Sequence, residues 1–303
     1  MTKHRGLVAG ASALTVLAGV AVVWILARPD GPEPSAWVDA FALAAVSTLF
    51  GLGMLALVDA EPAPGTVAVV AALWGATSLI SAWLQVAERA GAGPLDVGLR
   101  DMATGVESGL PVIVCVLGAL AVLGWSYAAA SGARSGGVNA YVVGAIAAVG
   151  ILVSSVTGHA GQSSWVPLVV GVHAIAAAWW VGTLAALVLT VRGRGGWARS
   201  LPVFSERAIV VVGVLTVTGV IAGVAQIGIG SQWWDTGYGR VLVAKVVALG
   251  CAVAVAWWHR TTWLAKARRH GASEKDSIRH AGYELALLTL VLGLAAGLAA
   301  TGV

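Results

Sequence analysis

The chain has 303 residues, of which 58% are hydrophobic and 11% are charged, and its formal net charge is +4. A soluble domain carries roughly 25% charged residues, so this composition excludes an ordinary soluble fold. Two cysteines exclude a disulfide framework and a multi-cysteine zinc or iron–sulfur site. The sequence has no phosphate-binding glycine loop, nucleophile elbow or HExxH motif, so we expect no enzyme activity.

Nine apolar stretches reach the length that a helix needs to cross a bilayer. About 20 apolar residues span the hydrocarbon as a helix, which satisfies its own backbone hydrogen bonds there. The sequence therefore predicts an all-α, polytopic transmembrane bundle of about nine helices in one domain, 1–303. The first stretch is too long for a signal peptide and is interpreted as a retained helix. The expected spans are 6–27, 36–58, 66–87, 109–131, 138–157, 165–191, 206–228, 238–259 and 281–302.

Lysine and arginine are distributed unevenly between the two sides of this bundle. With the N-terminus inside, 13 of the 18 basic residues fall on the cytoplasmic side. The positive-inside rule then predicts a cytoplasmic N-terminus and an external C-terminus, and it explains the basic residues better than nucleic-acid binding does. The longest segments between spans are an outer loop, 88–108, and two basic cytoplasmic loops, 192–206 and 260–280. The outer segments are acidic, which either concentrates cations there or merely complements the positive-inside bias.

Polar side chains that are costly in lipid gather in one layer of the outer leaflet. Such groups usually face a bundle interior or a wet cavity. At 1.5 Å per residue, His173, Lys245 and Cys115 lie roughly 12, 10 and 9 Å below the outer surface. His159 follows the outer end of its span, and Asp39 begins another. The layer is a candidate binding site.

Two imidazoles from adjacent helices, His159 and His173, could hold a soft or borderline metal at this layer. Imidazole suits copper, zinc, iron and nickel, whereas sulfur ligands favour monovalent copper. Cys115 in its span and Met102 in the outer loop could supply such sulfur, so copper fits best, in either oxidation state. Trp180 lies on the same helical stripe as His173 and could exclude water beneath the metal.

Each of these residues also has a purely structural interpretation. His173 could hydrogen-bond a neighbouring helix, and His159 could be an interfacial residue. Lys245 could extend outward to water or pair with Asp39 or Asp235. Cys115 could pack as a small apolar residue. On the inner side we expect an arginine contact for Glu284, and solvent or headgroups around four histidines, His4, His259, His270 and His280.

Two stretches carry motifs in a recognisable order. The first is His173-Ala-Ile-Ala-Ala-Ala-Trp-Trp-Val-Gly-Thr183, with a histidine followed by Trp-x-Gly. The second runs from Phe204-Ser through Thr218-Gly219 to Tyr238-Gly-Arg-Val-Leu-Val-Ala-Lys245. Together they resemble the CopD family of bacterial copper-resistance and copper-transport membrane proteins, over residues 150–265. The chain departs from the family pattern at Thr183, where glycine is expected, and at Val203, where arginine often precedes Phe-Ser.

This resemblance implies copper transport, most simply uptake, or copper handover across the bacterial cytoplasmic membrane. It implies His159 and His173 as metal ligands and a periplasmic copper-binding partner of the CopC type. It also implies that the chain is the first half of a fusion with a cytochrome oxidase assembly domain of the CtaG type. Two alternatives stay open: a haem-binding electron carrier with axial histidines, and a metal-free assembly factor for cytochrome oxidase.

Overall fold

The structure is a computed structural model that describes residues 3–29, 31–98, 100–101, 109–131, 139–156, 165–263 and 273–301. These residues form helices and turns and include no strand. A 3₁₀ turn, Leu55–Val58, follows α2, and a π-helical turn, His259–Trp263, follows α10. The helices are α1 (Lys3–Leu26), α2 (Ala36–Met54), α3 (Pro64–Ala90), α5 (Leu110–Ala130), α6 (Ala140–Val156), α7 (Val166–Thr190), α8 (Gly193–Ile227), α9 (Gln232–Asp235), α10 (Gly237–Trp258) and α12 (Glu274–Ala299).

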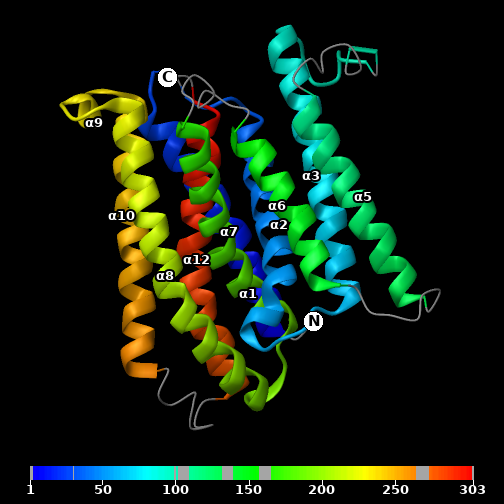
Figure 1. The fold of residues 1–303 in the computed structure, drawn as a ribbon. Helices are drawn as coiled ribbons and strands as arrows, with labels where there is room; N and C mark the ends of the chain where they lie inside the picture. Colours follow the sequence, from blue (N-terminus) through cyan, green and yellow to red (C-terminus); the bar gives the residue numbers. More distant parts are fainter. Residues whose placement is uncertain are drawn as a thin grey trace.

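The prediction of an all-α polytopic bundle is confirmed. Eight of the described helices are long and apolar enough to cross a membrane. The other expected span is α6, which is apolar but has only 17 described residues. Figure 1 shows the long helices side by side, with the two termini at opposite ends of the bundle. We name the end that holds the N-terminus the inner end and the opposite end the outer end.

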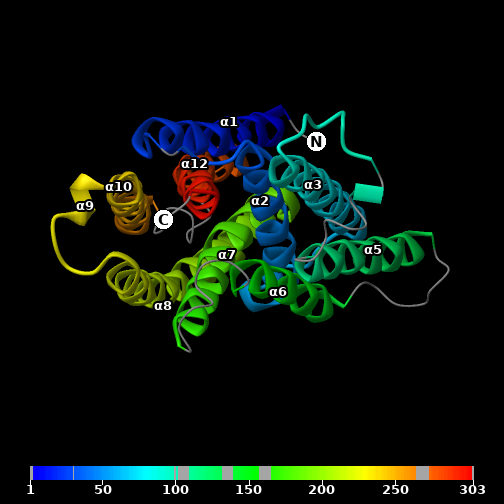
Figure 2. The same cartoon turned by 90° about the horizontal axis from the view of Figure 1, so that it is seen from above.

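Seen from above, the bundle has a centre and two flanks (Figure 2). Helices α2 and α7 lie in the middle and contact each other, and α1 packs along α12 beside them. Helices α3 and α5 form one flank, where α5 contacts only α3 and α6 closely. Helices α8 and α10 form the other flank, held mainly by α7 and α12 respectively. The contacts of α7 and α12 with this second flank hold most of the polar residues described below.

Glycines let the central helices approach backbone to backbone. A Cβ on Gly182 of α7 would lie 1.7 Å from the Ser47 oxygen of α2. A Cβ on Gly293 of α12 would likewise lie 2.1 Å from the Val16 oxygen of α1. Lipid provides no hydrophobic driving force between helices, so their association depends on close packing. Small residues allow that packing because they let two backbones approach. The high glycine content is therefore used at the helix crossings of the centre.

Two segments expected to be loops are largely helical. The segment 192–206 belongs to α8, because Trp197, Leu201 and Phe204 follow helical spacing and bury one face of an otherwise polar sequence. The segment 260–280 is helical at both ends, in the π-helical turn and in α12, while 264–272 lies outside the described residues. The α12 start is capped by Ser273, whose hydroxyl accepts from the Asp276 N–H at 3.1 Å.

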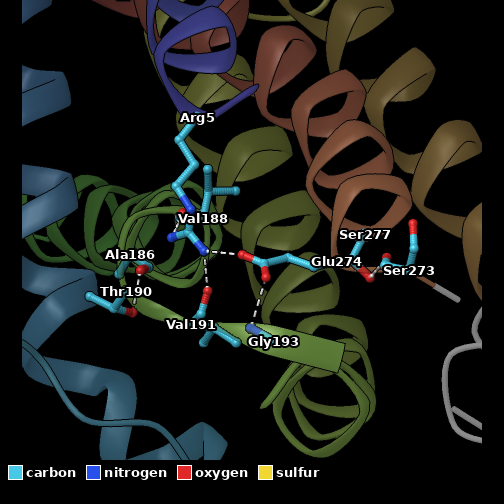
Figure 3. A network of polar contacts seen from close by, with 9 residues as sticks. All are labelled: Arg5, Ala186, Val188, Thr190, Val191, Gly193, Ser273, Glu274 and Ser277. Atoms are coloured by element: carbon cyan, nitrogen blue, oxygen red, sulfur yellow. Dashed lines mark hydrogen bonds and ion pairs between the residues drawn. The ribbon is translucent and has the colours of Figure 1, made fainter. Parts of the chain in front are cut away.

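One buried arginine ties the helices together at the inner end (Figure 3). Arg5 of α1, one of the basic residues that the sequence places on the cytoplasmic side, is 1% exposed. Its guanidinium donates to the carbonyls of Val188 (2.6 Å) and Val191 and to Glu274 Oε1 (2.7 Å). The second Glu274 oxygen accepts from the Gly193 N–H at 3.0 Å. The network thus satisfies carbonyls at the end of α7 and links α1, α7, α8 and α12.

Candidate metal site

His173 of α7 lies against a specific point on α8. Its Nδ1 is 3.1 Å from Thr218 Oγ1, and a Cβ added to Gly219 would lie 3.1 Å from its Cε1. The imidazole therefore rests on the Thr-Gly step that the sequence singled out. Glycine at 219 is what allows the ring this close to the α8 backbone.

The hydrogen bonds of Thr218 assign the proton on His173. The Thr218 hydroxyl donates to the Val214 carbonyl at 2.7 Å, and a carbonyl can only accept. With the hydroxyl proton on the Val214 carbonyl, Thr218 accepts from His173, and this arrangement favours the imidazole proton on Nδ1. The Nε2 atom keeps its lone pair and is the atom that can bind a metal.

Lys245 of α10 lies near enough to His173 to interact with it electrostatically. In the part of the chain that the structure describes, no carboxylate lies within ion-pair distance of this lysine. The expected pairing of Lys245 with Asp39 or Asp235 is therefore not found. A protonated ammonium beside the imidazole opposes cation binding and cannot itself coordinate a metal.

Asp39 belongs to a separate polar group between α2 and α3. Its carboxylate accepts from the Ser81 hydroxyl, which also accepts from Gln85 Nε2 at 3.0 Å. Nearby, Glu88 Oε1 accepts from the Ser35 N–H at 2.7 Å. Burial and the neighbouring Glu88 carboxylate raise the pKa of Glu33. Acidic side chains therefore gather at the outer end, but the structure does not bring Asp39 to His173.

Cys115 also lies apart from His173. Its Sγ is 3.6 Å from Ser154 Oγ and 3.9 Å from the Gly150 oxygen, at the contact of α5 with α6. Helix α5 is on the opposite flank from α8 (Figure 2). His159 and Met102 lie outside the described residues. Of the expected set, the structure thus brings together His173 and Lys245.

Trp180 faces a cavity at the inner end instead of the His173 layer. Its Nε1 donates to Glu284 Oε1 at 3.0 Å, and both residues line a cavity of about 170 Å³ between α7, α8, α10 and α12. His259 and His280 line the same cavity. The prediction that His259 faces solvent or headgroups is wrong, since this residue is 7% exposed. Within the described residues Glu284 contacts Trp180 and His259 and no arginine, while Arg268 and Arg269 lie outside the described residues.

A signal for this cavity was present in the sequence. His280 and Glu284 are four residues apart, so they share one face of a helix. The apolar run that defined the last span began at 281 and therefore separated them. The described residues contain no group of three or more His, Cys, Asp or Glu placed to hold a metal.

Comparison with known proteins gives a partial match. No curated protein and no solved structure matches the chain. Residues 198–298 match the family model of CopD, copper resistance protein D. This region begins in α8 and extends through most of α12, so it contains Thr218, Gly219 and Lys245 and begins after His173. The chain is a multi-pass membrane protein, and its residues 198–298 are similar to the CopD family.

Proposed function

We propose that this protein binds copper in the outer leaflet of the bacterial cytoplasmic membrane and passes it inward, by uptake or by handover. The observation that carries the proposal is the state of His173. Its Nδ1 is engaged by Thr218, which lies within the residues that match the CopD model, and its Nε2 is left as a ligand. A hydrogen bond to the other nitrogen is the usual way in which a protein orients a metal-binding histidine.

The second ligand, the choice of copper and the source of the metal are proposed from the chemistry of the ligands and from the acidic residues at the outer end. His159 is the proposed second ligand, because the short connection 157–165 joins its helix end to α7. Two imidazoles suit copper better than zinc, which usually takes four ligands. The acidic residues near Glu33 and Glu88 attract cations toward this end. A periplasmic copper-binding protein of the CopC type is the proposed donor of the metal there.

Copper titration of the purified protein in detergent micelles tests the proposal. Monovalent copper is added under reducing conditions, with a competing chromophoric chelator as the reporter. We expect His173→Ala to lose one bound copper per chain and His159→Ala/His173→Ala to lose no more than that. His4→Ala removes a histidine at the inner end and serves as the matched control. Unchanged copper content in His173→Ala, with the same melting temperature as wild type, contradicts the assignment.

A further inference from the structure

Two imidazoles do meet in the described part of the chain, at the inner end. His259 begins the π-helical turn after α10, and His280 lies in the second turn of α12. Their ring centroids are 5.1 Å apart, with an interplanar angle of 74°. Single-turn π-helical segments are rare and occur often at functional sites. The outer-end proposal involves neither residue.

The hydrogen bonds of His280 leave its Nε2 available. His280 Nδ1 is 2.8 Å from the Asp276 carbonyl oxygen, one turn earlier in α12. Because a carbonyl can only accept, Nδ1 carries the proton and Nε2 the lone pair. Stacking on Trp263, with centroids 4.8 Å apart and an angle of 11°, fixes the plane of the ring.

His259 is held in a corresponding way by a carboxylate. Its Nδ1 is 3.8 Å from Glu284 Oε2, which is ion-pair distance, and its Nε2 is buried without a hydrogen-bond partner. Trp180 anchors the other Glu284 oxygen at 3.0 Å. A carboxylate on the Nδ1 side favours the proton on that nitrogen and leaves Nε2 as the atom that can bind a metal. A buried, unpartnered imidazole nitrogen is costly unless something binds it.

The cavity around these rings suits a small, weakly hydrated ion. Its walls are mostly apolar and include Trp180, Phe204 and Trp263. Arg260 also lines it, but its guanidinium donates to the Ser205 carbonyl (2.9 Å) and hydroxyl (3.1 Å) on α8. Glu284 is the carboxylate that offsets a bound positive charge in this cavity.

We propose that His259 and His280 form a second copper site at the inner end, binding monovalent copper through their Nε2 atoms. This inference rests on the proposed function, in which copper crosses the bundle. Zinc usually requires four ligands, and the described residues contain no group of three or more potential ligands. Imidazole nitrogen is a ligand that suits copper, and the centroids of the two imidazole rings lie 5.1 Å apart. The site would receive copper before its release on the inner side.

Copper stoichiometry in two sets of variants tests the inner site separately from the outer one. The inner set is His259→Gln, His280→Phe and their combination, in which phenylalanine keeps the stack on Trp263. The outer set is His159→Ala/His173→Ala, and His4→Gln is the matched control. We expect the inner set to lose one monovalent copper per chain and to keep the ion of the outer site. Wild-type stoichiometry in folded inner variants overturns the inference.

X-ray absorption of the outer double variant, His159→Ala/His173→Ala, reports the copper ligands of the inner site while the inner residues stay unchanged. We expect this variant to keep one copper with two imidazole nitrogens, and copper to quench the fluorescence of the nearby Trp180 and Trp263. An outer double variant that binds no copper overturns the inner site while leaving the outer proposal intact. Conversely, the outer double variant could keep the wild-type copper stoichiometry while the inner variants lose their copper. That result removes the outer assignment and supports the inner one.

Discussion

The centre of the bundle and its α8–α10 flank are built on different principles. In the apolar stretches of α7 and α12, 61% of the residues are buried inside the protein, against 17% in those of α8 and α10. The central helices touch backbone to backbone at glycines. The flanking pair makes few contacts between its own two helices, and the inner cavity opens beside them.

This difference separates the residues that hold the fold from those that offer chemistry. The crossings within the centre are filled by the backbone itself. The polar groups lie where the centre meets the flank, with His173 of α7 against Thr218 of α8 near one end and His259 of α10 beside Glu284 of α12 near the other. Variants at the central crossings should therefore change stability with little specific effect on copper, and variants at the contacts with the flank should do the reverse.

The largest effect is expected for Gly182→Ala at the crossing of α7 with α2. The new Cβ would lie 1.7 Å from the Ser47 oxygen, so the two helices must separate. We expect a loss of about 3 kcal/mol of stability and a melting temperature lower by roughly 10 °C. Thermal unfolding in micelles measures it. Gly213→Ala in α8 is the control, since nothing lies within 4 Å of its Cβ; equal melting of the two variants would contradict the comparison.

The next effect is expected for Arg5→Met, which removes the clamp at the inner end. The change leaves the Val188 and Val191 carbonyls without this donor, and Glu274 keeps its hydrogen bond from the Gly193 N–H. Breaking a buried charge pair by removing one partner costs about 3 kcal/mol. Lys3→Met is the matched control, because Lys3 is exposed on the same helix. Chemical unfolding should show a large loss of stability for Arg5→Met and not for Lys3→Met. The copper affinity of the folded fraction should stay the same in both variants.

The fold was predictable where apolar length decides the structure. The expected spans agree with the described helices to within a few residues, except where polar sequence continues a helix, as at the starts of α8 and α12. There a single buried face, such as Trp197, Leu201 and Phe204, is enough to maintain the helix while the other face stays polar. A hydropathy threshold averages over both faces and therefore places such residues in a loop.

The candidate site was predictable only in part, because depth does not specify which face a side chain occupies. Depth placed His173, Lys245 and Cys115 in one layer, yet Cys115 faces α6 on the other flank. The Thr218-Gly219 step was recognised as a motif, and its contact with His173 follows only from the packing of α7 on α8. The inner histidines were assigned to solvent because basic neighbours surround them in the sequence, while the fold turns His259 inward.

A smaller effect, confined to the flank, is expected for Lys245→Met. The substitution keeps the length of the side chain and removes a positive charge that interacts with His173. Relief of roughly 1.4 kcal/mol of repulsion corresponds to about tenfold tighter copper binding at the outer site. Chelator competition in the inner-site double variant, His259→Gln/His280→Phe, isolates that affinity. Lys275→Met, an exposed lysine of α12, is the control. Weaker binding in Lys245→Met would show that the lysine assists the site.

The smallest effect is expected for Gly219→Ala, which shifts the His173 ring without removing any ligand. The new Cβ would lie 3.1 Å from Cε1 and 3.5 Å from Nδ1, so the ring must move by a few tenths of an ångström and its contact with Thr218 must lengthen. Because the Thr218 contact fixes the proton on Nδ1, a looser contact lets the imidazole rotate and change tautomer. We expect roughly threefold weaker copper binding at the outer site, equivalent to about 0.7 kcal/mol, with the melting temperature unchanged. Gly213→Ala again supplies the control on the same helix, and the same competition titration supplies the measurement. Equal affinities in the two alanine variants would mean that metal binding does not depend on the ring position that α8 imposes, and the outer site would then have to be formed by His173 in another orientation.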